Sequence, residues 1–221
     1  MIDLSEVKII YERRTSLVLK VLRDGTIQVR APFFVPKPII NEFVKKHSRM
    51  IEKNRERILL SKPKRKKYVN GEKFLYLGNE YQLQVGNYTQ IKLEKDKLLF
   101  PEALLFRAKK EIENWYVKSA REFIGSYVEQ YAKEMKTSFV TISYSDTISK
   151  WGSCTHDNRL QFNWRLIMTP VLVVRYVIIH ELAHTIEKNH SRAFWSRVAA
   201  FNPSYKQQIK WLRDNGNRLV T

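Results

Sequence analysis

The stretch that most restricts the fold of this chain is VLVVRYVIIHELAH, residues 171–184. It follows Pro170, a residue type that suits the first position of a helix. Its members before His180 are apolar on nearly every side of a helix, which predicts a helix buried in the core. Polar groups at the end of such a helix need a shared partner, because unpaired buried polar groups are costly.

The spacing of the polar residues in this stretch suggests what that partner is. His180 and His184 are four positions apart, so on a helix they lie on one face. Their ring nitrogens can reach one metal ion at about 2.0–2.1 Å, the distance that zinc requires. Glu181 lies about 100° further around the helix, outside the ligand shell but within reach of an activated water. This H-E-x-x-H pattern predicts a metal site, and the alternative is a core helix whose histidines have ordinary hydrogen bonds.

A third histidine, His190, follows six residues after His184. On a continuous helix that step is equivalent to a rotation of about 240°, which would point His190 away from the other two. It can be a ligand only if the helix ends first, and we expect that end at residues 187–189. Ser191 can then begin the next helix. Metzincins share the six-residue step, but they have glycine where this chain has Glu187, and no methionine follows His190.

The other histidines and the lone cysteine fit ordinary roles better. His47 lies in VKKHSR, which is typical of a surface, and His156 lies in a turn where it could contact substrate. Cys154 excludes an intrachain disulfide and fits a reducing compartment. It could be a fourth ligand or a redox switch, but a small buried thiol is the simpler interpretation.

The remaining pattern predicts an α+β protein in two regions. Residues 1–100 are expected to form a mainly antiparallel β region with one helix over residues 37–60, and residues 101–221 to form the domain that carries the histidines. A long helix over residues 102–136 links the regions. We expect strands at residues 15–22, 26–30, 73–77, 81–85, 90–94, 97–100, 139–143 and 159–166.

The net charge of +18 is the unusual bulk property. It favours polyanionic partners such as nucleic acid or nucleotides. The run KPKRKK, residues 62–67, is either a solvated linker or a loop that contacts phosphate. The sequence contains no signal peptide or apolar stretch of membrane-spanning length, so we expect a cytoplasmic protein without membrane contact. Its oligomeric state is open.

Four segments in this order resemble the YgjP-like metallopeptidase family, which is related to the SprT-like and WLM zincins: SKWGSC, LQFNWRLI, YVIIHELAH and NHSRAFW. GEKFLYLGNEYQL and WYVKSA extend the likeness over nearly the whole chain. The resemblance implies a minimal zincin catalytic domain with one zinc ion per chain. It implies His180, His184 and His190 as ligands and Glu181 as the catalytic residue. It leaves the substrate open, because UTP pyrophosphatase activity and association with DNA restriction systems are also attached to this family.

Three functions compete on these grounds. The first is a metallopeptidase in which zinc activates water, Glu181 is the general base, and an extended peptide substrate pairs with the strand over residues 159–166. The second is a nucleoside-triphosphate pyrophosphatase, although no phosphate-binding loop of the P-loop type is present. The third is a nucleic-acid-associated protease or binding module. Asn163, Arg165 and Tyr205 are candidate substrate-binding residues, and Trp151 is expected to pack beside the site.

Overall fold

The computed structural model describes residues 3–22, 25–60, 66–147 and 150–219. The chain divides into two compact units, Met1–Lys64 and Arg65–Thr221. Most of the basic run at residues 62–67 lies outside the described residues. Among the described helices, none is long and apolar enough to cross a membrane.

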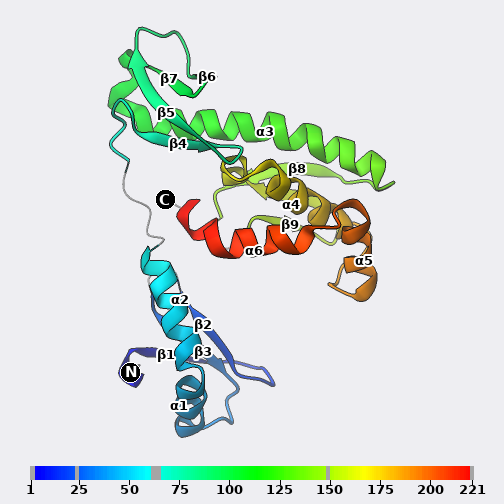
Figure 1. Ribbon diagram of the computed structural model, residues 1–221. Coiled ribbons are helices and arrows are strands. Elements are labelled where there is room, and N and C mark those ends of the chain that lie inside the picture. The colour runs from blue at the N-terminus through cyan, green and yellow to red at the C-terminus, as the bar shows by residue number, and fades with distance from the viewer. Residues whose placement is uncertain (1–2, 23–24, 61–65, 148–149, 220–221) are drawn as a thin grey trace. The chain divides into compact units, whose positions relative to one another are not determined.

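The amino-terminal unit is a small sheet with two helices (Figure 1). Its middle strand β3 pairs in parallel with β1 and antiparallel with β2. Side chains of β3 and of both helices form its core, because every second residue of β3 is fully buried. The elements are η1 Leu4–Glu6, β1 Val7–Tyr11, β2 Val18–Val21, β3 Ile27–Ala31, α1 Lys37–Lys46 and α2 Ser48–Leu60.

The single helix expected over residues 37–60 is two helices, and this prediction is wrong in that respect. The backbone of His47 leaves the helical conformation (φ −101°, ψ 11°) and caps α1. Its ring Nδ1 lies 2.8 Å from the carbonyl oxygen of Phe43. The apolar period continues across the break, which is why the sequence pattern alone did not reveal it.

The larger unit has two sheets and a helical layer. Its first sheet has the order β4-β5-β7-β6 and its second the order β8-β10-β9. The elements are β4 Lys73–Tyr76, β5 Asn79–Gly86, β6 Lys92–Glu94, β7 Lys97–Pro101, η2 Glu102–Arg107, α3 Ala108–Glu134, β8 Thr141–Ser145, β9 Gly152–Cys154, β10 Arg159–Asn163, η3 Trp164–Met168, α4 Val171–Ala183, α5 Arg192–Phe201, α6 Tyr205–Asn215 and η4 Gly216–Leu219.

The long helix α3 organises this unit (Figure 1). Its buried residues recur every four positions from Ala108 to Val128, and the helix contacts α4, η3 and β8. Phe74, Leu83 and Phe100 of the first sheet belong to the same core cluster as α3 and α4. The first sheet therefore packs with the helices, and the compact unit begins near residue 65, whereas the expected division was at residue 100.

The α+β class is confirmed, but its sheets are mixed. In addition to their antiparallel pairs, each has one parallel pair: β1 with β3, β5 with β7, and β8 with β10. The expected strand over residues 159–166 ends at Asn163, because the chain then turns into the 3-10 helix η3. Two short strands, β1 and β9, were not expected.

Candidate metal centre

The buried helix α4 carries the first two histidines. It begins after Pro170, as expected, and its residues Val173, Val174 and Ile178 are at most 2% exposed. The helix ends at Ala183, and His184 is its C-cap, with φ −68° and ψ −15°. His180 and His184 therefore lie one turn apart at the end of a helix that core packing fixes.

The chain turns immediately after α4. The backbone N–H groups of Ile186 and Glu187 both donate to the carbonyl oxygen of Ala183, which closes the last turn. The helix thus ends before His190, as the sequence requires, but earlier than the expected residues 187–189. Lys188 ties the returning segment to the β9–β10 turn, because its Nζ donates to the carbonyl oxygen of Thr155 at 3.2 Å and to Asn158 Oδ1 at 2.5 Å.

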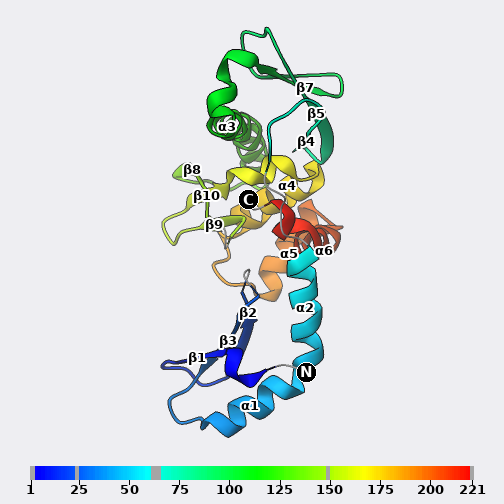
Figure 2. The same ribbon diagram turned by 90° about the vertical axis from the view of Figure 1, so that its left-hand side faces the viewer.

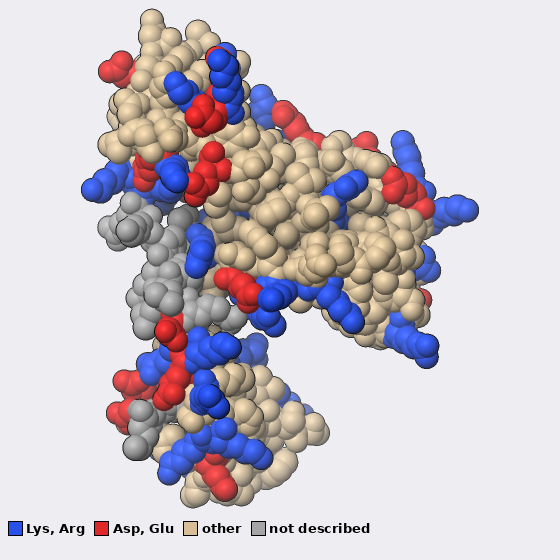
Figure 3. All heavy atoms as spheres, in the orientation of Figure 1, with Lys and Arg blue, Asp and Glu red and all other residues tan. Residues whose placement is uncertain are grey.

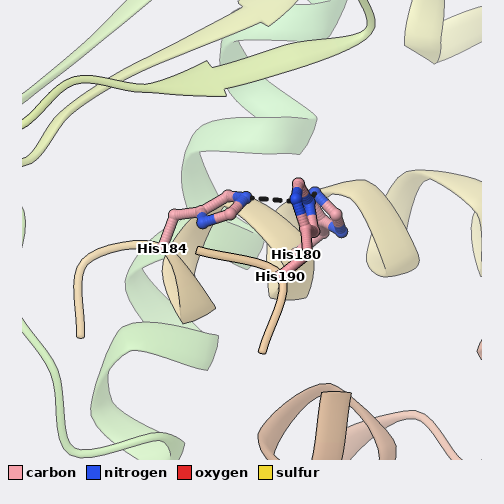
Figure 4. A group of neighbouring side chains, drawn as sticks. All are labelled: His180, His184 and His190. Atoms are coloured by element: carbon pink, nitrogen blue, oxygen red, sulfur yellow. Dashed lines mark hydrogen bonds between the residues drawn. The ribbon is translucent and has the colours of Figure 1, made fainter. Parts of the chain in front are cut away.

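The turn brings the three histidines together (Figure 4). The Nε2 atom of His190 lies 3.2 Å from Nε2 of His184 and 3.2 Å from Nε2 of His180. Ligands at about 2.0–2.1 Å around a tetrahedral zinc ion lie about 3.3–3.4 Å from one another. The observed spacing therefore fits three imidazoles that hold one ion through their Nε2 atoms.

Contacts behind two of the rings fix their orientation. Nδ1–H of His184 donates to the carbonyl oxygen of Glu187 at 3.0 Å, which leaves the lone pair on Nε2. The hydroxyl of Tyr176, one turn earlier on α4, lies 3.3 Å from Nδ1 of His180. Such partners hold metal-binding histidines in one orientation and one tautomer.

An aromatic layer from α5 supports all three rings. Ser191 caps α5 by accepting from the N–H of Phe194, as expected of its sequence. The fully buried Phe194 ring lies 4.9, 4.4 and 4.8 Å, centroid to centroid, from His180, His184 and His190. The ring of Trp195 stacks on His190 at 5.6 Å. The start of α5 therefore supports the histidine cluster.

Burial favours the neutral form of His180 and His184. It lowers the pKa of His180 to about 3, and the neighbouring His184 and His190 add to the shift. Burial also lowers the pKa of His184, while the hydrogen bond to Glu187 opposes that change. Neutral rings with facing lone pairs are the form that binds a cation.

Glu181 lies on the buried side of α4, only 5% exposed. Its side chain packs against Gly152 of β9, so closely that an added Cβ on the glycine would lie 2.6 Å from Glu181 Oε1. Burial raises the pKa of Glu181 to about 8, and Lys150 opposes this shift. Within the described ranges no hydrogen bond to the carboxylate is found, and a mostly buried acid with a raised pKa is typical of a functional site.

Two of the three expected substrate-binding residues have structural contacts. Asn163 is 2% exposed; its side chain accepts from the N–H of Arg165 and donates to the carbonyl oxygen of Thr147. Arg165 is 3% exposed, pairs with Asp146 and lies over the Trp164 ring. Their role in substrate binding stays a prediction.

Tyr205 lies beside the aromatic layer. Its ring stacks on Trp195 at 5.1 Å, one ring away from His190. Trp151 packs closely against Gly216, and its supporting place beside the site stays a prediction.

The remaining expected candidates lie outside the histidine cluster. His156 is exposed in the β9–β10 turn, and His47 caps a helix of the other unit. Cys154 is partly buried; its thiol donates to the carbonyl oxygen of Thr155, and burial raises its pKa. In the part of the chain that the structure describes, the cluster that could hold a metal consists of His180, His184 and His190 without Cys154.

One expectation about the sheet beside the site is wrong. The strand over residues 159–166 was expected to offer a free edge, but β10 lies between β8 and β9 (Figure 2). Both of its edges are therefore paired. β9 is an outer strand of this sheet, and it contacts α4.

Sequence reasoning gave no role to Gly152, Tyr176 or Phe194, and it expected Lys188 only to favour the end of the helix. Tyr176 could have been found from its four-residue spacing before His180, because that spacing stacks side chains on one face. Gly152 and Lys188 act through contacts between segments distant in sequence, for which helical periodicity gives no signal. Phe194 is near His184 and His190 in sequence, but the turn between the two helices interrupts the helical period that would relate them.

The basic charge does not gather in one place on the visible face. Lys and Arg side chains there are interspersed with Asp and Glu over both units (Figure 3). A nucleic-acid or nucleotide partner therefore remains a prediction from the net charge.

Comparisons with known proteins give one family. No curated protein matches. The metallopeptidase zymogens abylysin from Pyrococcus abyssi and jannalysin from Methanocaldococcus jannaschii are similar solved structures, with 15% and 18% identity and TM-scores of 0.38 and 0.36. Each match covers 41% of this chain and 92% and 94% of those chains, respectively. The family model for the YgjP-like metallopeptidase domain matches residues 15–215, and the chain therefore belongs to the YgjP-like metallopeptidase family.

Proposed function

We propose that this protein is a zinc-dependent peptidase with Glu181 as its general base. The observation that carries the proposal is that Nε2 of His190 lies 3.2 Å from Nε2 of both His180 and His184, with the buried Glu181 next to His180 on the same helix. His180, His184 and His190 would hold one zinc ion. Zinc in such a site polarises a carbonyl group and lowers the pKa of water.

Glu181 would move the proton. Its carboxylate takes a proton from the attacking water and delivers it to the amine that leaves the peptide bond. The raised pKa of about 8 supports the first step, because a carboxylate in an apolar environment accepts a proton readily. A nearby cation would lower that pKa, so the ion and the burial act in opposite directions on Glu181.

The substrate would bind along β9 instead of the originally expected β10. An outer strand offers unpaired N–H and C=O groups to an extended peptide, and β9 packs against the helix that carries Glu181. Peptide pairing there would deliver the scissile bond to the three histidines. Tyr205, behind Trp195, is the candidate for stabilising the developing oxyanion.

A comparison of three proteins tests the proposal. Zinc-loaded wild type, Glu181→Gln and the matched control Glu129→Gln, which changes an exposed glutamate on α3, are each incubated with casein and separately with UTP. We expect wild type and Glu129→Gln to release peptides equally. Glu181→Gln should keep its zinc and lose activity by about a thousandfold or more.

Two results would overturn the proposal. Full casein hydrolysis by Glu181→Gln would remove Glu181 from the mechanism. Pyrophosphate release from UTP by wild type, without proteolysis, would favour the competing pyrophosphatase function.

A further inference from the structure

The strand β9 and the helix α4 meet at Gly152 and Glu181 with no space for a side chain. A Cβ added to Gly152 would lie 2.6 Å from Oε1, 2.7 Å from Cγ and 2.9 Å from Cδ of Glu181. Non-bonded carbon atoms pack at about 3.5–4.0 Å, so each of these contacts would be an overlap. Any residue other than glycine at position 152 would therefore have to displace something.

The backbone of β9 is held in place. Residues 152–154 pair antiparallel with residues 160–162 of the central strand β10. The preceding carbonyl, of Trp151, accepts from the N–H of Asn163 at 2.8 Å. The Trp151 ring in turn presses on Gly216 at the carboxy-terminal end of α6, where an added Cβ would lie 3.0 Å from it. The strand therefore has little freedom to retreat from α4.

The backbone of α4 is equally fixed. Glu181 lies between Ile179, which is 1% exposed, and the fully buried Leu182 and Ala183. A shift of the helix would also separate His180 from His190. The mobile partner in this contact is the Glu181 side chain itself, which can turn about its own rotatable bonds.

We propose that Gly152 is a positioning residue: it lets the Glu181 carboxylate lie flat against the β9 backbone and so determines where the general base stands. Within the described ranges no hydrogen bond performs this task, and the close packing against Gly152 limits where the side chain can lie. The inference rests on the proposed role of Glu181. It assigns a function to the glycine of the WGSC segment at residues 151–154.

The test is Gly152→Ala in the zinc-loaded protein, with Gly125→Ala as the matched control. A Cβ on Gly125, in α3, would make only an ordinary contact of 3.6 Å with Tyr144 Oη. We expect Gly152→Ala to bind zinc within about twofold of wild type, since the three atoms nearest to the added Cβ all belong to Glu181 and none to a histidine ligand. Its kcat should fall about a hundredfold with KM changed far less, because a displacement near 1 Å costs about that factor. Gly125→Ala should match wild type in both parameters.

Wild-type kcat in Gly152→Ala would overturn the inference while leaving the proposed function intact, provided that Glu181→Gln is inactive. If Gly152→Ala does not fold, Glu181→Ala is added, which removes the overlapping Cγ, Cδ and Oε1 atoms. Restored folding then supports the contact, and continued misfolding contradicts it. If wild type hydrolyses no peptide, the proposed function fails separately.

In that case the contact between Gly152 and Glu181 is tested by the thermal unfolding midpoints of wild type, Glu181→Ala, Gly152→Ala and the double variant. Coupled shifts of the midpoint support the contact, and additive shifts contradict it.

Discussion

The amino-terminal sheet and the sheet beside the histidines have the same topology. In both, the third strand lies in the middle, parallel to the first and antiparallel to the second. In both, the chain then passes a proline, Pro36 or Pro170, into a helix without a side-chain N-cap. Both of these helices end on a histidine C-cap, His47 in α1 and His184 in α4.

The differences between these two regions account for the site. After His47 the next helix begins at once, at Ser48, whereas residues 185–190 separate His184 from the α5 cap at Ser191. Only that longer segment can return a second ring toward the helix end. The fold alone therefore does not create the metal centre; a turn of sufficient length and a close strand do.

The largest expected effect comes from replacing the two capping histidines by alanine in separate variants and comparing their zinc affinities. His184→Ala removes a ligand, and we expect zinc affinity to fall by about a thousandfold or more. His47→Ala removes a side chain in the same topological place that has no metal-binding neighbours among the described residues, and affinity should not change. A chromophoric zinc competitor measures both. Equal zinc affinities of His184→Ala and His47→Ala would contradict the claim that only the end of α4 holds a metal ligand.

A smaller effect is expected from the partner of His180. Tyr176→Phe removes the hydroxyl 3.3 Å from Nδ1, and we expect zinc affinity to fall by about 10- to 100-fold. Tyr88→Phe, in the loop after β5, is the control for loss of a tyrosine hydroxyl. Unchanged affinity in Tyr176→Phe would show that the aromatic layer alone orients His180.

The third prediction concerns pH and the metal-free protein. Folding raises the pKa of Glu181 to about 8, so between about pH 4.5 and 8 the folded state keeps a proton that the unfolded state has lost. Stability that this group contributes at low pH is therefore lost as the pH rises to 8. Glu181→Gln cannot lose a proton, and we expect its advantage in unfolding free energy over wild type to grow by about 1–3 kcal/mol from pH 5 to 8.

Urea unfolding in EDTA measures this difference. His180 and His184, whose pKa values are lowered, make both proteins less stable as the pH falls below 6.5, and this contribution cancels in the comparison. Parallel stability curves for the two proteins would contradict a buried, protonated Glu181.

The smallest expected effect tests the turn itself. Lys188→Ala removes two hydrogen bonds that tie residues 184–190 to the β9–β10 turn. Because the histidine rings keep their own contacts, we expect zinc affinity to fall only about threefold. Lys118→Ala, an exposed lysine on α3, is the control. A loss of zinc affinity above a hundredfold would mean that residues 184–190 depend on the Lys188 hydrogen bonds for their conformation.

Local sequence signals predicted a large part of this picture. The apolar run after Pro170 predicted a buried helix, and the geometry of a six-residue step required α4 to end before His190. The helix ended sooner than expected because core packing stops at Ala183, a tertiary effect. The central place of β10 and the contact of Gly152 with Glu181 depend on segments distant in sequence that meet in space, whereas the break at His47 is local and lies within a continuous apolar period. Periodicity along the chain carries no information on such meetings.

The central claim is the ligand set, and X-ray absorption at the zinc edge of the loaded wild-type protein tests it most directly. The account predicts one zinc ion per chain with three imidazole nitrogens and one further light atom at about 2.0–2.1 Å. A sulfur at about 2.3 Å would place Cys154 on the metal. That result, or a spectrum with only two imidazoles, would contradict the three-histidine centre at the end of α4.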